Sequence, residues 1–278
     1  MPLYTSTSDV GGLLPDDYGP LVVQPAMEAS VAATVSTIVQ TRSTIYRVPV
    51  VADDPTAQWV AEGAEIPPDD PTLEELTITP KKVAGLTIIS SELANDSSPA
   101  AVQVVGDGLA RDIARRMDQA FFAGLAAPAE PGLSTLSGVQ THVAASAFAN
   151  LDFAAEAISK AEQVGATITS FITSPATALA LAKIKQATGS NQPVLGLDAT
   201  SATSRSILGV PLLVSQYVAA NTLWAVDSSR TWLVVREDTT VEADRSVFFT
   251  SDRVAVRAVM RVGYGFTHPQ SVVRVTTA

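Results

Sequence analysis

The sequence contains no cysteine and only two histidines, at positions 142 and 268. The absence of cysteine excludes disulfides and thiolate metal sites, and two histidines leave little for a zinc or iron centre. No run of about 18 uninterrupted apolar residues suggests a membrane-spanning helix, so we expect no membrane association. The first residues also lack the basic and apolar regions of a secretory signal. We therefore expect synthesis and use inside a cell.

Catalytic and cofactor motifs are also missing from the sequence. It contains no G-x-S-x-G, S-x-x-K or H-E-x-x-H motif and no P-loop. Gly263-Tyr264-Gly265 is half of a dinucleotide fingerprint, without the third glycine or a βαβ context. Neither histidine lies near an obvious acid and nucleophile, and we interpret both as structural. The sequence predicts a protein that is not an enzyme and that holds no cofactor and no metal.

Positive charge is scarce as well. The 278 residues carry a net charge of −10 with a pI near 4.6, which argues against binding nucleic acid through a general basic surface. Hydrophobic residues make up 46% of a 29.0 kDa chain, enough for a sizeable core and for two domains. The composition therefore indicates a folded acidic protein.

The most regular stretch runs from Ser98 to Gly124 and predicts one long helix. Ser98 suits the N-cap and Pro99 the first helical position. Apolar residues recur at helical spacing, at Val102, Val105, Leu109, Ile113, Met117, Ala120 and Phe121. At 1.5 Å per residue the helix is about 39 Å long, which exceeds the average in globular proteins. We interpret it as a strut.

The most acidic stretch, Asp53–Lys82, predicts a projecting hairpin. It holds eight carboxylates against two lysines, a local net charge of −6. The segment Pro67–Pro71 reads PPDDP, which predicts a turn. We expect strands at Gln58–Glu65 and Leu73–Thr79, the second continuing into Val83–Ile89. Such a hairpin is too long and too acidic to fold back on its own core, so its buried-type side chains predict contact with another subunit.

The predicted contact residues of this hairpin are apolar and acidic side chains: Trp59, Glu62, Glu65, Ile66, Glu74 and Glu75. Their predicted partners are arginines. The strand Arg253–Val262 alternates between apolar and basic residues, so one face is buried and the other basic. Arginines in an acidic protein favour pairing with carboxylates over nucleic acid. The candidate basic partners are Arg111, Arg115, Arg116, Arg253, Arg257 and Arg261.

The rest of the chain suggests an arm and an α/β unit. Residues 1–20 are polar and show no periodicity, and Leu21–Val39 predicts a helix followed by a short strand at Ile45–Val51. Asn150–Val164 predicts a helix. A strand at Thr167–Thr173 and a second helix from Pro175 to Ala187, capped by Ser174 and stopped by Gly189, follow it.

Five segments then resemble, in the same order, those of the tailed-phage major capsid proteins of the HK97 fold. They are Trp59–Gly63, Ile89–Leu93 with Asp96, Ala114–Gly124, Leu208–Leu212 and Arg253–Val262. The resemblance covers roughly residues 12–275. It implies an α+β fold with an N-terminal arm and short helix (1–40), an E-loop hairpin (41–90), a spine helix (91–130), an A-domain (131–235) and closing P-domain strands (236–278).

The resemblance implies a structural major capsid protein. Such a protein self-assembles through pentamers and hexamers into an icosahedral head that encloses double-stranded DNA without specific binding. The protein is then expected to be located in the virion, after assembly in the host bacterial cytoplasm. Expected partners are a portal, a separate scaffolding protein, since no scaffolding domain precedes the family-like region, and a cement protein as a further candidate. The alternatives are an encapsulin-type nanocompartment shell and, in a different class, a soluble acidic hydrolase or binding domain.

Some relatives join an E-loop lysine to a P-domain asparagine, with a glutamate as catalyst. The outer hairpin, Gln58–Pro80, contains no lysine, and Lys81 and Lys82 lie near its expected base. The four asparagines are Asn95, Asn150, Asn191 and Asn221, so the closing segment has none. Because an isopeptide bond needs an amine, an amide acceptor and a base together, we expect a shell without covalent links.

Overall fold

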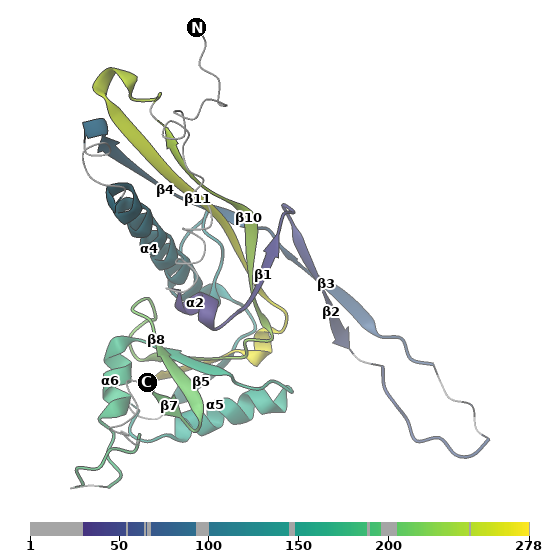
Figure 1. Cartoon of the computed structure of the whole chain (residues 1–278). Coiled ribbons are helices and arrows are strands. Elements are labelled where there is room, and N and C mark those ends of the chain that lie inside the picture. Colours follow the sequence, from purple (N-terminus) through teal and green to yellow (C-terminus); the bar gives the residue numbers. More distant parts are fainter. Residues whose placement is uncertain are drawn as a thin grey trace.

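In the computed structural model, strands from distant parts of the chain form two sheets, and a hairpin projects away from both (Figure 1). The structure describes residues 30–53, 55–63, 65, 68–92, 100–144, 148–187, 190–195, 205–244 and 246–277. Residues 1–29 of the predicted arm and short helix lie outside these ranges, as do Ser98, Pro99, Ile66 and Gly189. Within the ranges, no helix is both long and apolar enough to cross a membrane.

The first sheet has four strands in the order β1-β10-β11-β4. Its members are β1 (Thr37–Thr41), β10 (Thr231–Asp244), β11 (Arg253–Phe266) and β4 (Lys81–Ser90). β1 runs parallel to β10, and the other two pairs are antiparallel. The alternation predicted for β11 is confirmed, because its apolar residues are buried on one face: Val254, Val256, Ala258, Met260 and Val262.

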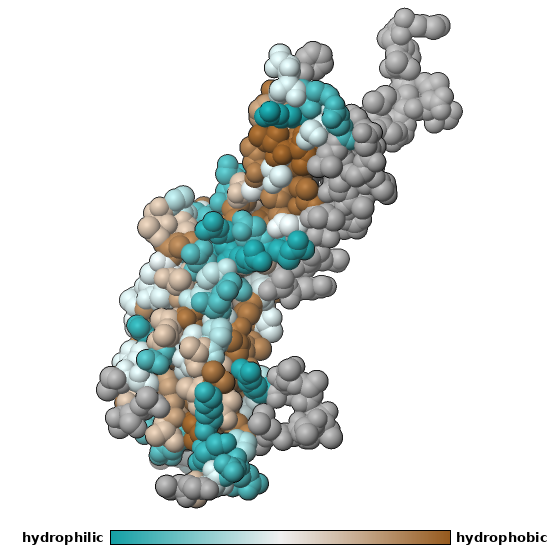
Figure 2. All heavy atoms as spheres, turned by 90° about the vertical axis from the view of Figure 1, so that its left-hand side faces the viewer, coloured by the Kyte–Doolittle hydropathy of each residue, from teal (hydrophilic) through white to brown (hydrophobic). Residues whose placement is uncertain are grey.

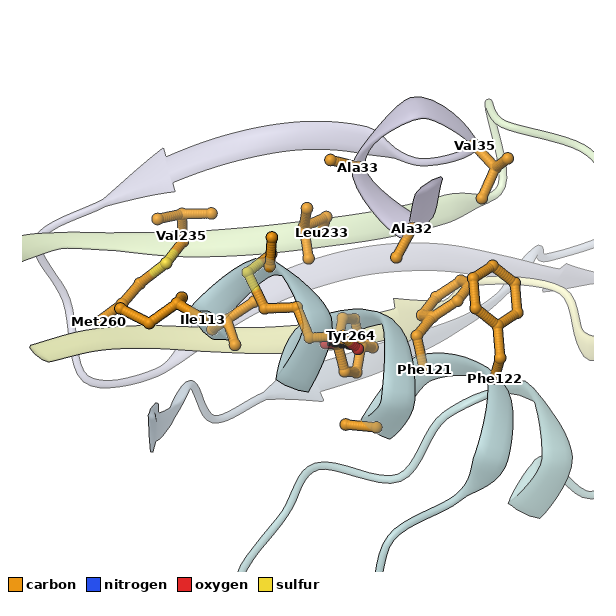
Figure 3. Close-up of a cluster of buried hydrophobic side chains, with 14 of the residues drawn as sticks. Ala32, Ala33, Val35, Ile113, Phe121, Phe122, Leu233, Val235, Met260 and Tyr264 are labelled. Carbon is orange, nitrogen blue, oxygen red and sulfur yellow. Dashed lines mark hydrogen bonds between the residues drawn. The ribbon is translucent and has the colours of Figure 1, made fainter. Parts of the chain in front are cut away.

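The long helix α4 (Ala100–Ala123) lies against this buried face and confirms the predicted strut. Its apolar stripe includes Ile113, Met117 and Phe121, each at most 2% exposed. Figure 3 shows Ile113 and Phe121 beside Met260 and Tyr264 of β11. The Tyr264 hydroxyl donates to the Met117 carbonyl at 2.9 Å, so one of the few polar groups in this core is satisfied.

A short helix, α2 (Val31–Thr34), packs on α4 through Ala32 and Ala33. Ser30 caps it by accepting from the Ala33 N–H. The predicted helix Leu21–Val39 is wrong at its end, because β1 begins at Thr37. The β-branched residues there pair with β10, and this tertiary pairing overrides their weak helical periodicity.

The second sheet has six strands in the order β5-β12-β9-β6-β8-β7. They are β5 (Gln140–Ala144), β12 (Val273–Thr277), β9 (Thr222–Val226), β6 (Ser170–Thr173), β8 (Val210–Val214) and β7 (Ser206–Ile207). Short 3₁₀ turns lie at Leu133–Thr135, Phe249–Ser251 and Pro269–Ser271. The chain passes between the two sheets between β4 and β5, between β9 and β10, and between β11 and β12. Strands distant in sequence therefore meet in each sheet.

Two helices accompany the second sheet: α5 (Asp152–Gln163) and α6 (Pro175–Ala182). Both predicted helices are confirmed, but α6 is five residues shorter than the predicted Pro175–Ala187. Ser174 caps α6 by accepting from the Thr177 N–H, as predicted. Phe153 and Leu181 belong to a second core beneath this sheet.

The hairpin is built differently from the prediction. It pairs β2 (Tyr46–Asp53) with β3 (Thr72–Ile78), which confirms the strands predicted at Ile45–Val51 and Leu73–Thr79. The strand predicted at Gln58–Glu65 is wrong, because the described residues there form an irregular loop. The segment Tyr46–Asp53 takes the place beside β3 that was predicted for Gln58–Glu65, and the described residues of 58–65 lie in the loop between the two strands.

The hairpin base packs on the face of the four-stranded sheet that points away from α4. Ile78 is 1% exposed and forms a small core with Val48 and Val234. A Cβ atom at Gly265 would lie 2.2 Å from Ile78 Cδ1, and one at Gly263 would lie 2.7 Å from Ile78 Cγ2. The two glycines of Gly263-Tyr264-Gly265 therefore make room for the hairpin.

Candidate assembly interface

The loop that joins β2 to β3 and the start of β3 expose apolar and acidic side chains together. Trp59 is 105% exposed, Leu73 69% and Val60 37%. Exposed carboxylates lie among them, at Glu62, Glu65, Asp70 and Glu74. Figure 1 shows the loop at the far end of the hairpin, away from both sheets. Large apolar side chains on such a projection are typical of a surface that is buried on a partner.

Two of the hairpin carboxylates have partners in their own chain. Glu75 pairs with Arg47 across the hairpin, at 2.9 Å. Asp69 accepts hydrogen bonds from the Thr56 hydroxyl and from the Thr56 N–H, the latter at 2.8 Å. These bonds hold the pKa of Asp69 below its usual range. Among the predicted contact residues, Glu75 is therefore less available to a partner than Glu62, Glu65 and Glu74.

The predicted arginines of α4 are exposed but face two different cavities. Arg111 and Arg115 line a cavity of about 430 Å³ together with Pro175 and Tyr217. Arg116 lines another, of about 480 Å³, and hydrogen-bonds Gln119 at 3.2 Å. Figure 2 shows this side of the molecule, with hydrophilic atoms across its middle and apolar atoms gathered above them. The three arginines therefore do not form a single site.

The predicted arginines of β11 lie on the opposite side of the sheet from α4. Arg253 and Arg257 are exposed and Arg261 is half-buried, each alternating with a buried apolar residue. Arg257 forms an ion pair with Glu242 of β10, which confirms the expectation of carboxylate pairing for this residue. The six predicted partners are thus divided between two faces of the molecule.

The register places two further cations beside Arg261. Arg236 of β10 and Lys82 of β4 both lie directly opposite it, so the three side chains form a row across adjacent strands on one face. We call Arg236, Arg261 and Lys82 the cationic row. Arg236 also donates to the Arg42 carbonyl at 3.3 Å. No sequence pattern places Arg236 and Lys82 beside Arg261, because their proximity depends on pairing between strands far apart in the chain.

Both histidines have partners that agree with a structural role. His142 Nδ1 lies 2.9 Å from Glu156 of α5. His268 Nδ1 lies 2.9 Å from Arg230, and burial together with that guanidinium lowers the pKa of His268. Within the described part of the chain, no cluster of three histidine or carboxylate side chains forms a metal site.

A long helix against a four-stranded mixed sheet, with an exposed acidic hairpin, is typical of a subunit of a larger assembly. The model of the phage capsid family matches residues 10–277. The chain therefore belongs to the phage capsid family and is a structural capsid protein. This confirms the resemblance seen in the sequence.

Similar proteins agree with this assignment. A capsid polyprotein of Pseudomonas phage PAJU2 is 26% identical over 196 residues, which is 65% of this chain. The chain spans about 28% of that relative's length. A structure from Mycobacterium phage Adephagia matches with a TM-score of 0.71 and 20% identity, over 99% of each chain. The capsid of an empty GTA particle matches with a TM-score of 0.74 and 21% identity, over 100% of this chain and 95% of that one. These likenesses confirm the HK97-like fold.

Proposed function

We propose that this chain self-assembles through pentamers and hexamers into an icosahedral shell that encloses phage DNA. The observation that carries the proposal is the hairpin loop, which leaves Trp59, Glu62 and Glu65 exposed at the end of the hairpin, away from both sheets (Figure 1). A closed assembly of identical subunits provides a counterpart for this loop at every position. The net charge of −10 supports enclosure of DNA without specific binding.

The proposal assigns a role to each part of the chain. Residues 1–40 act as the arm, 41–90 as the E-loop, 91–130 as the spine helix, 131–235 as the A-domain and 236–278 as the closing strands. The shell forms in the host cytoplasm and remains in the virion, and the subunit has no enzymatic role. A portal, a separate scaffolding protein and a cement protein are the proposed partners.

Purified full-length protein is expected to form rings or shells of megadalton mass, seen by sedimentation and electron microscopy. Interfaces of standard size, about 1,600 Å², on several sides of each subunit would hold such particles together. A wild-type chain that stays a stable 29 kDa monomer under all assembly conditions would contradict the proposed function.

Mature particles boiled in denaturing detergent are expected to run as a single band near 29 kDa. The two lysines closest to the hairpin are Lys81 and Lys82. They lie at the start of β4 in the four-stranded sheet and not in the hairpin loop. Asn221, the last asparagine in the sequence, precedes β9 of the other sheet. A ladder of covalent multimers that survives boiling would show that an amine and its acceptor do meet across subunits.

A further inference from the structure

The two central strands of the four-stranded sheet are linked to the six-stranded sheet at the same end. β10 begins at Thr231, which pairs with Phe266, the last residue of β11. The chain reaches Thr231 from β9, and after Phe266 it continues to β12. The β9–β10 and β11–β12 connections therefore lie side by side, at the place where the two sheets join.

Arg230 holds these two connections together. Its carbonyl accepts from the Thr267 N–H at 3.1 Å and from the Thr267 hydroxyl at 3.2 Å. Its guanidinium donates to the Gly165 carbonyl, just after α5, at 2.7 Å, and its Nη1 lies 2.9 Å from His268 Nδ1. Its Nε lies 3.7 Å from Oδ2 of the buried Asp227. One half-buried residue thus contacts both connections and the end of α5.

The contact between Arg230 and His268 needs a neutral imidazole. A guanidinium only donates hydrogen bonds, so His268 Nδ1 has to accept. A proton on this nitrogen would remove the acceptor and place two cations 2.9 Å apart. Burial and the Arg230 guanidinium both lower the pKa of His268, so the proton binds at a lower pH than it does on an ordinary histidine.

The neighbouring charged groups keep Arg230 in place when His268 takes up a proton. Asp227 faces Arg230 and is itself fixed, because it accepts from the Ser229 N–H at 2.9 Å and from the Thr167 N–H at 3.2 Å. Lys160 of α5 donates to a carbonyl of β5 at 2.7 Å. Protonation therefore separates His268 from an arginine that remains bound to Asp227 and to the end of α5.

We propose that Arg230 and His268 form a pH-sensitive clamp on the two connections, closed at neutral pH and opened by one proton on His268. Opening releases the β11–β12 connection from Arg230, which stays with the β9–β10 connection. The clamp lies within one chain, so this inference goes beyond the proposed function and does not depend on assembly. The other histidine is a natural control: His142 pairs with Glu156, and a proton there adds an attraction instead of a repulsion.

Nuclear magnetic resonance of the unassembled chain, with ¹⁵N-labelled histidine, tests the contact. The chain has two histidines, so the variant His142→Asn assigns both sets of signals. At neutral pH, His268 is expected to carry its proton on Nε2 and none on Nδ1. Its titration midpoint is expected below that of the urea-unfolded chain, and Arg230→Gln is expected to raise it, because a neutral amide replaces the guanidinium. A doubly protonated His268 at neutral pH, or a midpoint that Arg230→Gln leaves unchanged, would overturn the proposal.

Hydrogen exchange measured by mass spectrometry tests the opening. After correction for intrinsic exchange rates, peptides that cover residues 227–231 and 266–272 are expected to exchange at least about threefold faster in acid than at neutral pH, roughly the factor that one hydrogen bond contributes. His268→Asn keeps an acceptor close to the position of Nδ1 but binds no proton, so it is expected to show no such increase. His142→Asn is expected to respond as the wild type does.

The same exchange measurement also shows when the clamp is wrong. An equal increase in wild type and His268→Asn, or no increase in wild type, would overturn it. Failure of the wild-type chain to form particles would contradict the proposed function and leave the clamp as it stands, because both tests use the unassembled chain.

Discussion

Replacing Glu62, Glu65 and Glu74 together by glutamine is expected to abolish assembly while the chain still folds. The hairpin region carries a local net charge of −6, and these three side chains are exposed and make no described contact in their own chain. Glutamine keeps their size and removes the charge, so the change acts on the contact between copies. Loss of three charge-assisted contacts per interface is expected to reduce the assembled fraction at least about a hundredfold.

Light scattering follows the assembly, and circular dichroism of the unassembled chain reports its fold. The control variant is Glu75→Gln, which removes one hairpin charge whose partner is Arg47 of the same chain. This variant is expected to assemble nearly as the wild type does. Unchanged assembly of the triple variant would show that the hairpin charges do not hold the shell together.

Periodicity in the sequence predicted the elements that bury one face against a core. The helix over Ala100–Ala123 and the strand over Arg253–Phe266 follow from the spacing of their apolar residues, since burial on one face dictates that spacing. The sequence did not predict the order of the strands in the two sheets. β1 pairs with β10 across nearly two hundred residues of chain, and no local pattern encodes that choice.

For the same reason, the sequence predicted only part of the candidate site. The acidic residues of the hairpin are contiguous in sequence, so their common location was visible at once. The residues of the cationic row are not contiguous: Lys82, Arg236 and Arg261 come from three strands and meet only through the sheet register. The misplaced strand at Gln58–Glu65 has a related cause, because alternation shows that a segment can pair but does not show with what.

One polar contact in the core gave no signal in the sequence. Asp118 of α4 is 6% exposed and accepts three hydrogen bonds at the start of α2. Its Oδ1 accepts from the Ser30 hydroxyl at 2.7 Å and from the Ala32 N–H at 2.9 Å, and its Oδ2 accepts from the Val31 N–H at 3.1 Å. No pattern in the sequence predicts a partner for Asp118. These three hydrogen bonds hold the start of α2 against α4.

Replacing Asp118 by alanine is expected to lower the free energy of unfolding by about 3 kcal/mol at neutral pH. The variant leaves the Val31 and Ala32 N–H groups without acceptors, and each unsatisfied buried group costs about 1–3 kcal/mol. Urea denaturation of the unassembled full-length chain measures the loss. The matched variant Ser30→Ala removes one bond to the carboxylate and the cap of Ala33, and is expected to cost only about 1 kcal/mol.

The pH dependence of the folding stability distinguishes an effect of the Asp118 carboxylate from an effect of packing alone. Burial raises the pKa of Asp118 despite the hydrogen bonds from Ala32, Ser30 and Val31, which lower it. The folded chain therefore keeps the proton to a higher pH than the unfolded chain does, and the stability contributed by this group decreases as pH rises through the raised pKa. The stability difference between wild type and Asp118→Ala is thus expected to be largest in acid, below the ordinary pKa of an aspartate, and to narrow as pH rises through the raised pKa. A difference that stays constant from acid to neutral pH, or that widens, would show that the carboxylate is not held in this buried position.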